Sequence, residues 1–237
     1  MREQAWIMKQ SWHDLAFLHW KVPLDALRPL VPDYLEIDTY QGQAWIAVVP
    51  FEMSRIRVRG LPFVPGTSQF LEINTRTYVL PKDGGKPGVW FHSLDGANRL
   101  GVETARKLFR LNYLMASMRM DVKGDEHKYH SVRTDSRFAS AEFAADYRPT
   151  GPVNLAKEGS LEHWLTERYC LYSPGKDGQL LRGDIRHNPW PIQPGTCEVT
   201  TNSMLTALGL GIDRQPDHVL YSQNLRAEVC LPRPNNL

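Results

Sequence analysis

One short segment of the chain gathers the residue types that amine chemistry requires. Residues 100–113, LGVETARKLFRLNY, place one carboxylate and three cations between Glu103 and Arg110. A lysine amine attacks a carbonyl carbon only when it is uncharged, and neighbouring cations and burial lower its pKa toward that state. Arg106 and Arg110 are such neighbours for Lys107. The segment is therefore a candidate reactive-lysine site.

The same spacing also fits an ordinary surface helix. If residues 97–110 are helical, Glu103 and Lys107 form an i,i+4 pair in the favourable order. The carboxylate then stabilises the ammonium form and raises the lysine pKa. A shift of that pKa from about 10.4 to about 7 requires roughly 4–5 kcal/mol against the charged form. Spacing alone therefore favours a solvated helix face over a reactive amine.

A strand further upstream carries a second set of candidate residues. Residues 69–80, QFLEINTRTYVL, alternate strictly, as expected of a β-strand with two different faces. One face carries Glu72, Asn74 and Arg76, with aromatic residues before and after them. Such a face is either the solvent-exposed side of a sheet, which periodicity alone favours, or the wall of a mixed polar and aromatic pocket.

The remaining pattern predicts the elements that must position these side chains. Further strands are predicted at residues 43–51, 88–95, 111–122, 127–134, 140–147, 169–173, 178–187 and 218–231, and helices at 23–32, 97–110, 160–168 and 203–209. Ser160 is the expected N-cap of the third helix, and SPGKDGQ reads as a hairpin turn. We predict a mainly β (α+β) fold as a single domain over residues 1–237. One large curved antiparallel sheet would form a cone- or barrel-like cavity with a few short covering helices.

Composition narrows the classes of function. The 237 residues are 42% hydrophobic and 23% charged, as in a globular protein, and the net charge of +2 offers no basic field for nucleic acid. The sequence contains no run of about 18 apolar residues, so no membrane span is predicted. The N-terminal residues MREQAWIMKQSWHD lack the apolar core of a signal peptide. Together with three widely spaced cysteines, this leads us to expect a cytoplasmic protein.

The sequence lacks the usual cofactor and metal motifs. It has no GxGxxG, GxxxxGK or GxSxG motif and no HxxxH or HExxH pair. His127 and His130 would point to opposite faces of one strand, which makes them a poor metal-binding pair. We therefore expect no cofactor and no metal.

A proline-rich segment follows the predicted strand at 178–187. Residues 186–195, RHNPWPIQPG, contain three prolines that fix φ and remove backbone donors, so the segment must be rigid and extended. Trp190 in this segment either plugs one end of the sheet or forms the rim of a pocket. The sequence leaves these two alternatives equal.

Several of these segments resemble one known family. The chain is similar to the YqjF-like proteins of the acetoacetate decarboxylase-like superfamily in WIMKQSWHDLAFLHWKVPLDALRPLVPDYLEIDTYQGQAWIAVVPF, FLEINTRTYV, GVWFHSLD, ARKLFRLNY and HNPWPIQPG. Within them, KVPLDALRPLVPDYLEID resembles the decarboxylase segment RTDMDALRKVVPEPLEID. The resemblance implies a cone- or barrel-like antiparallel sheet around a central cavity.

The resemblance carries over the decarboxylase site only in part. The decarboxylase arginine falls on Lys21, and the decarboxylase glutamate falls on Glu72. The motif GRE.....KKL lies over GVE.....FRL here, so the Schiff-base lysine falls on Phe109 and the second lysine on Arg110. Phenylalanine cannot form an imine, and the resemblance therefore implies that acetoacetate decarboxylation is not retained. Lys107 could replace the missing amine on a strand, but on a helix it would point about 200° away from Phe109.

The sequence supports three hypotheses about function. The first is a decarboxylase-like cavity that binds a small carbonyl or carboxylate compound without Schiff-base chemistry, with or without a reaction that follows. The second is a lysine-dependent decarboxylase or aldol-type enzyme that uses Lys107 or Lys21. The third is a non-enzymatic scaffold or interaction protein, such as a homo-oligomer. We prefer the first.

The first hypothesis assigns roles to named side chains. Glu72, Arg110 and Lys107 are the candidate catalytic residues, with Glu72 as acid, base or orienting acceptor. The predicted ligand-binding residues are Lys21, Glu72, Asn74, Arg76, Phe109, Arg110 and Trp190.

Overall fold

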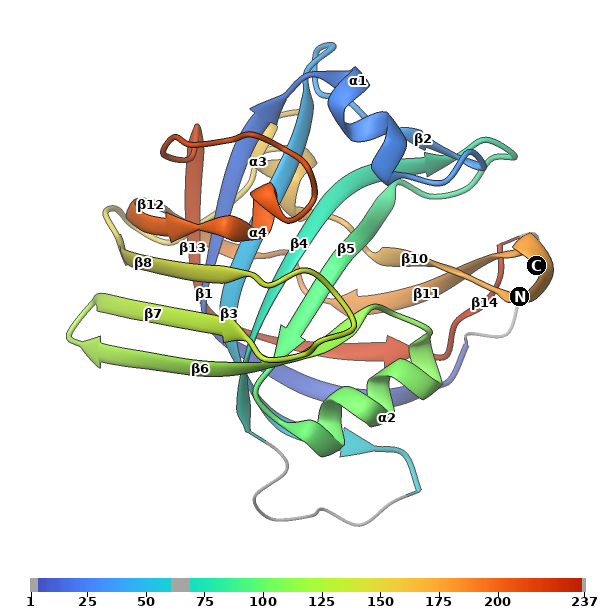
Figure 1. Cartoon of the computed structure of the whole chain (residues 1–237), viewed down its shortest axis with the longest axis horizontal. Helices are drawn as coiled ribbons and strands as arrows, with labels where there is room; N and C mark the ends of the chain where they lie inside the picture. The colour runs from blue at the N-terminus through green and yellow to red at the C-terminus, as the bar shows by residue number, and fades with distance from the viewer. Residues whose placement is uncertain (1–3, 61–68, 236–237) are drawn as a thin grey trace.

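Strands make up most of the computed structural model, which describes residues 4–60 and 69–235 (Figure 1). The strands are β1 (Trp6–Val22), β2 (Leu35–Ile37), β3 (Ala44–Val58), β4 (Phe70–Pro81), β5 (Gly88–Gly96), β6 (Tyr113–Lys123), β7 (Glu126–Arg133), β8 (Glu142–Pro149), β9 (Asn154–Leu155), β10 (Cys170–Pro174), β11 (Leu180–His187), β12 (Pro191–Asn202), β13 (His218–Cys230) and β14 (Arg233–Pro234). The helices are α1 (Leu24–Leu27), α2 (Arg99–Phe109), α3 (Leu161–Thr166) and α4 (Ser203–Thr206), with 3₁₀ turns at Arg28–Leu30 and Lys176–Gly178. The predicted mainly β (α+β) class is confirmed. No helix within the described ranges is long and apolar enough to cross a membrane.

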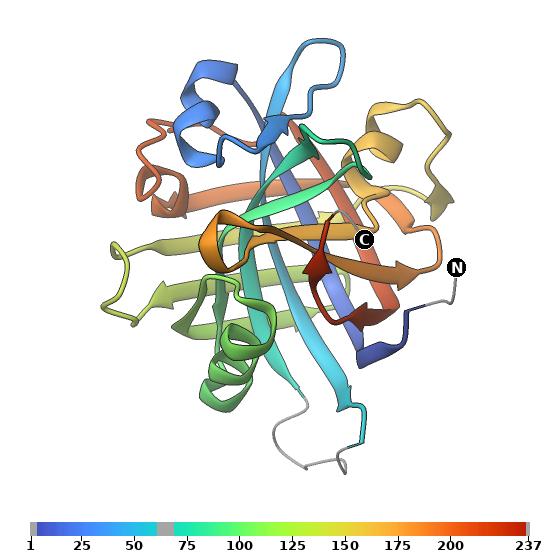
Figure 2. The ribbon, with the colours of Figure 1, turned by 90° about the vertical axis from the view of Figure 1, so that its right-hand side faces the viewer.

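The strands close into two rings that share one wall. The shared wall runs β13-β1-β3-β4-β5, and each neighbouring pair is antiparallel. On one side, β6, β7, β8 and β12 lead from β5 back to β13 and close a barrel. On the other side, β10 pairs with β5 and β11 pairs with β13, so this hairpin closes a second ring. Figure 1 shows the two closures on opposite sides of the long strands, and Figure 2 shows β10 and β11 crossing in front of them.

The first ring is filled by an apolar core. Buried side chains from the shared wall, from β7 and β8, and from α1 and α4 meet there, among them Trp20, Ile46, Tyr129, Phe143 and Leu205. Full burial of a large aliphatic or aromatic side chain contributes about 1.5–3 kcal/mol. This side of the wall therefore supplies a large part of the folding free energy.

Strand β1 breaks its alternation at Asp14. Gln10 and Trp12 line the second ring, and so does Leu15, although a regular strand would turn Leu15 to the opposite face. Asp14 has a φ of 50°, in the left-handed region that non-glycine residues rarely adopt, and the register with β3 shifts next to it. Both halves of β1 can therefore face the second ring. The break also explains why periodicity does not predict this strand.

Closure of the second ring depends on a glycine in β5. A Cβ atom on Gly88 would lie 2.8 Å from the backbone oxygen of Cys170 and 2.7 Å from Cε2 of Tyr172. Separations this short are well inside van der Waals contact. The backbones of β5 and β10 can pair here because Gly88 has no side chain.

Most of the predicted elements are present near their expected positions. The strand predicted at 69–80 is β4, and the helix predicted at 97–110 is α2. The Asn98 side chain caps α2 by accepting a hydrogen bond of 2.9 Å from the Gly101 amide. Ser160 caps α3 as predicted, because its hydroxyl accepts from the His163 amide.

One segment differs in detail from the prediction, and two others are as predicted. Residues 23–32 form the short helix α1 and then a 3₁₀ turn, because Pro29 interrupts the regular hydrogen-bond ladder. Residues 186–195, predicted as a rigid extended segment, end β11 and begin β12. The SPGKDGQ turn joins β10 to β11 as the predicted hairpin.

Candidate functional site

A cavity of about 80 Å³ lies inside the second ring. Every strand of that ring contributes to its wall, and the end of α2 and the segment after α3 complete it. The aromatic part of the wall comprises Trp12, Phe51, Phe91, Phe109, Tyr113 and Trp190. The polar part includes Gln10, Glu72, Asn74, Arg76, Arg168 and His187. A site of this size has room for several water molecules or a small organic compound.

The structure brings most of the predicted ligand-binding residues to this cavity. Those that line it are Glu72, Asn74, Arg76, Phe109 and Trp190. Glu72 is 2% exposed and Asn74 is 4% exposed, so this face of β4 is a pocket wall and not the solvent-exposed side of the sheet. The Trp190 ring also packs in a core cluster with Phe17 and Leu225, so it is both core and pocket wall.

Three predicted residues lie outside the cavity wall: Lys21, Lys107 and Arg110. Helix α2 ends in a left-handed residue, Arg110, with a φ of 53°. Phe109 is 4% exposed and faces the cavity, whereas Lys107 and Arg110 are exposed to solvent. Lys107 therefore lies on a helix. From a helix its amine cannot take the place of the decarboxylase lysine that the resemblance aligns with Phe109.

Lys21 lies far along β1 from the cavity. Six strand steps separate Lys21 from Leu15, the nearest β1 residue of the cavity wall, which is about 20 Å of extended strand. Its ammonium group is exposed and lies 5.6 Å from the centre of the Trp45 ring. The alignment with the decarboxylase arginine therefore does not place a cation in the cavity.

Glu72 is a carboxyl group held in its neutral form. Burial raises the pKa of Glu72 to about 8, and the negative charge of Asp95 acts in the same direction. Hydrogen bonding with Tyr113 and Asn74 lowers this pKa and offsets part of the effect. The Oε2 atom has no hydrogen-bond partner among the described residues. At neutral pH, Glu72 can therefore donate a proton or a hydrogen bond to a molecule in the cavity.

This raised pKa predicts a particular dependence of stability on pH. Between about pH 4.5 and pH 8 the folded state binds a proton at Glu72 that the unfolded state has lost, so the free energy of unfolding falls as pH rises. Relative to Glu72→Gln, the wild type should lose a few kcal/mol across this window and level off above it. Urea denaturation of both proteins at several pH values measures the difference. Parallel curves for the two proteins would contradict the buried neutral carboxyl.

Arg76 is a half-buried cation without a carboxylate partner among the described residues. Its guanidinium lies 5.3 Å from the centre of the Phe17 ring, and no described residue forms an ion pair with it. Its Nε atom is buried without a hydrogen-bond acceptor among the described residues. Burial lowers the pKa of Arg76, the interaction with the Tyr78 hydroxyl raises it, and the charge of Arg168 lowers it again, but an arginine stays charged at neutral pH.

Arg168 lies at the same cavity and is only partly neutralised. Its Nη1 atom donates to Asp38 over 2.6 Å, and its Nε atom donates to the Trp164 carbonyl over 2.7 Å. Its Nη2 atom is buried without a partner in the described part of the chain. Two guanidinium groups and one carboxylate thus give this part of the cavity an excess of positive charge, which favours an anion.

Unpaired polar atoms are concentrated at this cavity. The buried atoms without a partner among the described residues include Gln10 Oε1, Trp12 Nε1, Glu72 Oε2, Asn74 Oδ1, Arg76 Nε and Arg168 Nη2. Buried polar groups in folded proteins nearly always have a hydrogen-bond partner. Such an arrangement is typical of a site in which a bound molecule or water supplies the missing hydrogen bonds.

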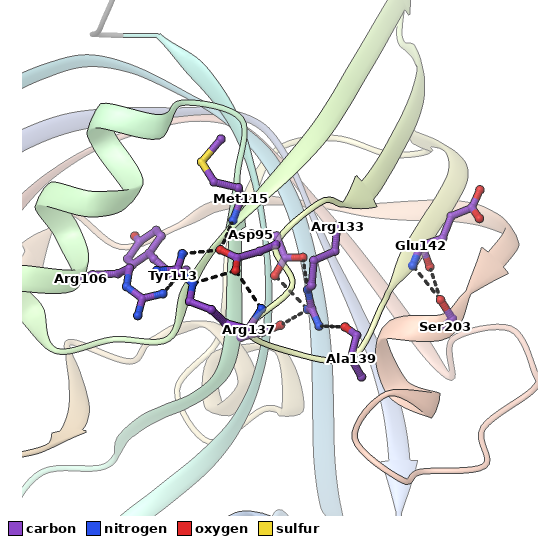
Figure 3. A network of polar contacts seen from close by, with 11 residues as sticks. Asp95, Arg106, Tyr113, Met115, Arg133, Arg137, Ala139, Glu142 and Ser203 are labelled. Atoms are coloured by element: carbon purple, nitrogen blue, oxygen red, sulfur yellow. Dashed lines mark hydrogen bonds and ion pairs between the residues drawn. The ribbon is translucent and has the colours of Figure 1, made fainter.

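A network of ion pairs and hydrogen bonds fixes the wall formed by α2 and β6 (Figure 3). Arg133 donates to both carboxylate oxygens of Asp95, over 2.8 Å and 3.0 Å, and both side chains are nearly fully buried. Arg106 donates to the Tyr113 carbonyl over 2.9 Å and so joins the last turn of α2 to the start of β6. These contacts hold Phe109 and Tyr113 against the cavity.

The sequence does not predict Gln10, Trp12 or Arg168 as parts of the site. Gln10 and Trp12 belong to β1, whose alternation is broken, and Arg168 follows α3 without any motif. No group of three or more metal-ligating side chains occurs in residues 4–60 and 69–235. The wall of the cavity contains no lysine among the described residues.

Comparison with known proteins identifies the family. Residues 9–226 match DUF2071, described as "Uncharacterized conserved protein (COG2071)". The chain belongs to this family. It is 43% identical over 218 residues to "Uncharacterized protein YqjF" of Bacillus subtilis (strain 168), covering 92% of this chain and 88% of that protein. The resemblance to YqjF-like proteins is thereby confirmed.

Solved structures show that this DUF2071 member has the acetoacetate decarboxylase-like fold. An acetoacetate decarboxylase-like enzyme from Sphingomonas wittichii RW1 superposes with a TM-score of 0.64, at 12% identity, over 98% of this chain and 94% of that chain. The enduracididine biosynthesis enzyme MppR complexed with pyruvate gives a TM-score of 0.63, at 12% identity, over 99% of this chain and 91% of that chain. At such low identities the likeness establishes the fold alone.

Proposed function

We propose that the protein binds a small carboxylate compound with a carbonyl group in the cavity of the second ring, without forming a Schiff base. The observation that carries this proposal is the Arg76 guanidinium, which has no carboxylate partner among the described residues and lies beside the partly neutralised Arg168. A ligand carboxylate would pair with these two cations through charge-assisted hydrogen bonds. The aromatic wall would cover the apolar part of such a ligand.

Glu72 supplies the complementary group for the carbonyl oxygen. A neutral carboxylic acid donates a hydrogen bond to a carbonyl oxygen and can transfer its proton as negative charge develops there. Glu72 and Arg76 lie on the same face of β4, four residues or about 13 Å apart along the strand, and the long side chains of both line the same cavity. Without a lysine in the described wall, no imine forms, and the carbonyl stays a hydrogen-bonded group.

Pyruvate is a suitable probe, because it combines a carboxylate with a carbonyl and is the ligand named for the structurally similar MppR. Trp12 and Trp190 line the cavity, so tryptophan fluorescence should report a saturable titration with pyruvate. Borohydride reduction of the mixture followed by mass spectrometry should then yield no covalent adduct.

Each other outcome opposes the proposal. An adduct that disappears in Lys107→Ala or Lys21→Ala would establish the lysine-dependent alternative instead. The absence of any saturable response to pyruvate would remove the support for a carboxylate and carbonyl ligand. As a matched control, Lys107→Ala should bind pyruvate like the wild type, because Lys107 is exposed and outside the cavity wall.

A further inference from the structure

A second hollow with strongly basic walls lies on the sheet formed by β3, β1, β13 and β11. It encloses about 600 Å³ and is much larger than the cavity of the second ring. The cations that line this basic groove are Lys9, Arg55, Arg57, Arg186 and Arg226, and its one acidic residue in the described chain is Glu228. The whole protein has a net charge of only +2, so this groove concentrates positive charge locally.

The strand register places these charges side by side. Arg57 pairs with Lys9 across β3 and β1, Lys9 pairs with Glu228 across β1 and β13, and Glu228 pairs with Arg186 across β13 and β11. Charged side chains directly opposite one another on neighbouring strands lie within interaction distance, and like charges there repel. Arg57 and Lys9 are the like-charged neighbours in this row, and a bound anion would relieve their repulsion.

The acidic residue of the groove already has an ion-pair partner, whereas three of its arginines have none among the described residues. The Glu228 carboxylate forms an ion pair with the Lys9 ammonium over 2.5 Å. Arg55, Arg57 and Arg226 are exposed and form no hydrogen bond or ion pair with any residue that the structure describes. Their guanidinium groups are therefore available to a ligand.

The backbone of β3 is distorted at this groove. Three steps along β3, from Arg57 to Ser54, oppose two steps along β1, so an extra residue is inserted as a bulge. Arg55 lies in the bulge with a φ of 52°, a left-handed conformation that non-glycine residues rarely adopt. Backbone strain of this kind is often found at binding sites.

We propose that this groove binds a small molecule bearing a phosphate or diphosphate group. Guanidinium groups match phosphate oxygens in a bidentate geometry and remain charged at any physiological pH. The groove wall contains no Trp, Tyr or Phe among the described residues, so it lacks the stacking surface with which proteins hold single-stranded nucleic acid. Gln10 and His187 border both the groove and the cavity, so the two sites are neighbours. The proposal does not depend on the ligand of the cavity.

Calorimetric titration with inorganic pyrophosphate tests the proposal. The wild type should bind it with an affinity that falls as salt increases. The triple variant Arg55→Gln/Arg57→Gln/Arg226→Gln should bind at least about tenfold more weakly, because it loses three charge-assisted contacts. The control Arg99→Gln/Arg119→Gln/Arg148→Gln removes the same charge from exposed arginines outside the groove and should bind as the wild type does. Circular dichroism melting should show that both variants remain folded.

Three results would overturn this assignment. The first is no measurable binding of pyrophosphate by the wild type. The second is an equal loss of affinity in both triple variants, which would indicate a response to overall charge. The third is tighter binding of a short single-stranded oligonucleotide than of pyrophosphate, with the same dependence on the groove arginines, which would make the groove a nucleic-acid site.

Discussion

Replacing Arg133 by methionine is expected to lower the free energy of unfolding by about 3–5 kcal/mol, because it leaves a buried charge without its partner. Arg133 and Asp95 have side chains that are 4% and 2% exposed, and Arg133 also donates to Ser93 and to the Ala139 carbonyl. Burial raises the pKa of Asp95, and the Arg133 charge is what opposes that effect. Urea denaturation measures the loss.

The control for this prediction is Arg119→Met. Arg119 pairs with Asp121 over 3.0 Å, but the two side chains are 76% and 58% exposed. Exposed pairs contribute about 0–1 kcal/mol, so this variant should remain close to the wild type. If Arg133→Met were no less stable than Arg119→Met, the buried pair would not be a structural support of the site. The double variant Arg133→Met/Asp95→Asn should recover part of the loss, because it no longer contains an unpaired charge.

Replacing Arg76 by methionine is expected to weaken pyruvate binding while leaving the protein as stable as before, or more stable. Loss of one partner of a buried charge pair costs about 2–5 kcal/mol in binding, which is about 30-fold to several-thousand-fold in affinity. In the protein without ligand, the Tyr78 side chain and the Phe17 ring offset the desolvation of Arg76, but no carboxylate in the described structure does, so removal of this charge should cost little stability. Fluorescence titration and thermal melting measure the two effects.

Two further variants make the Arg76 result specific. Arg76→Lys keeps the charge but loses the bidentate geometry, and it should bind with intermediate affinity. Lys107→Met removes one positive charge from the exposed face of α2 and should change neither property. Unchanged pyruvate affinity in Arg76→Met, or a large loss of stability there, would show that this arginine is structural and not a ligand-binding group.

The sequence predicts the part of the site that lies on one regular element. Strict alternation in β4 is enough to place Glu72, Asn74 and Arg76 on one face, because the side chains of a strand repeat every two residues. It does not decide whether that face meets solvent or a cavity. That depends on β10 and β11, which lie far away in the sequence and cover the face only when the second ring closes.

The remainder of the site depends on irregular features that leave no periodic signal. The bend at Asp14 turns Trp12 and Leu15 to the same side, and no local sequence pattern predicts this bend. Arg168 reaches the cavity through its contacts with Asp38 and Trp164, which only the folded chain brings together. Charge density in the sequence makes Lys107 a candidate reactive amine, but the helical geometry of α2 directs its side chain to solvent.

The shared wall of the two rings has a consequence for how this protein can change over evolutionary time. Residues on one face of β1, β3 and β4 fill the apolar core, and residues on the other face line the cavity. Substitutions on the cavity face can alter which molecule is accepted while the packing that supports folding, on the opposite face, stays intact. Proteins of this architecture can therefore diverge at the cavity face without losing the fold.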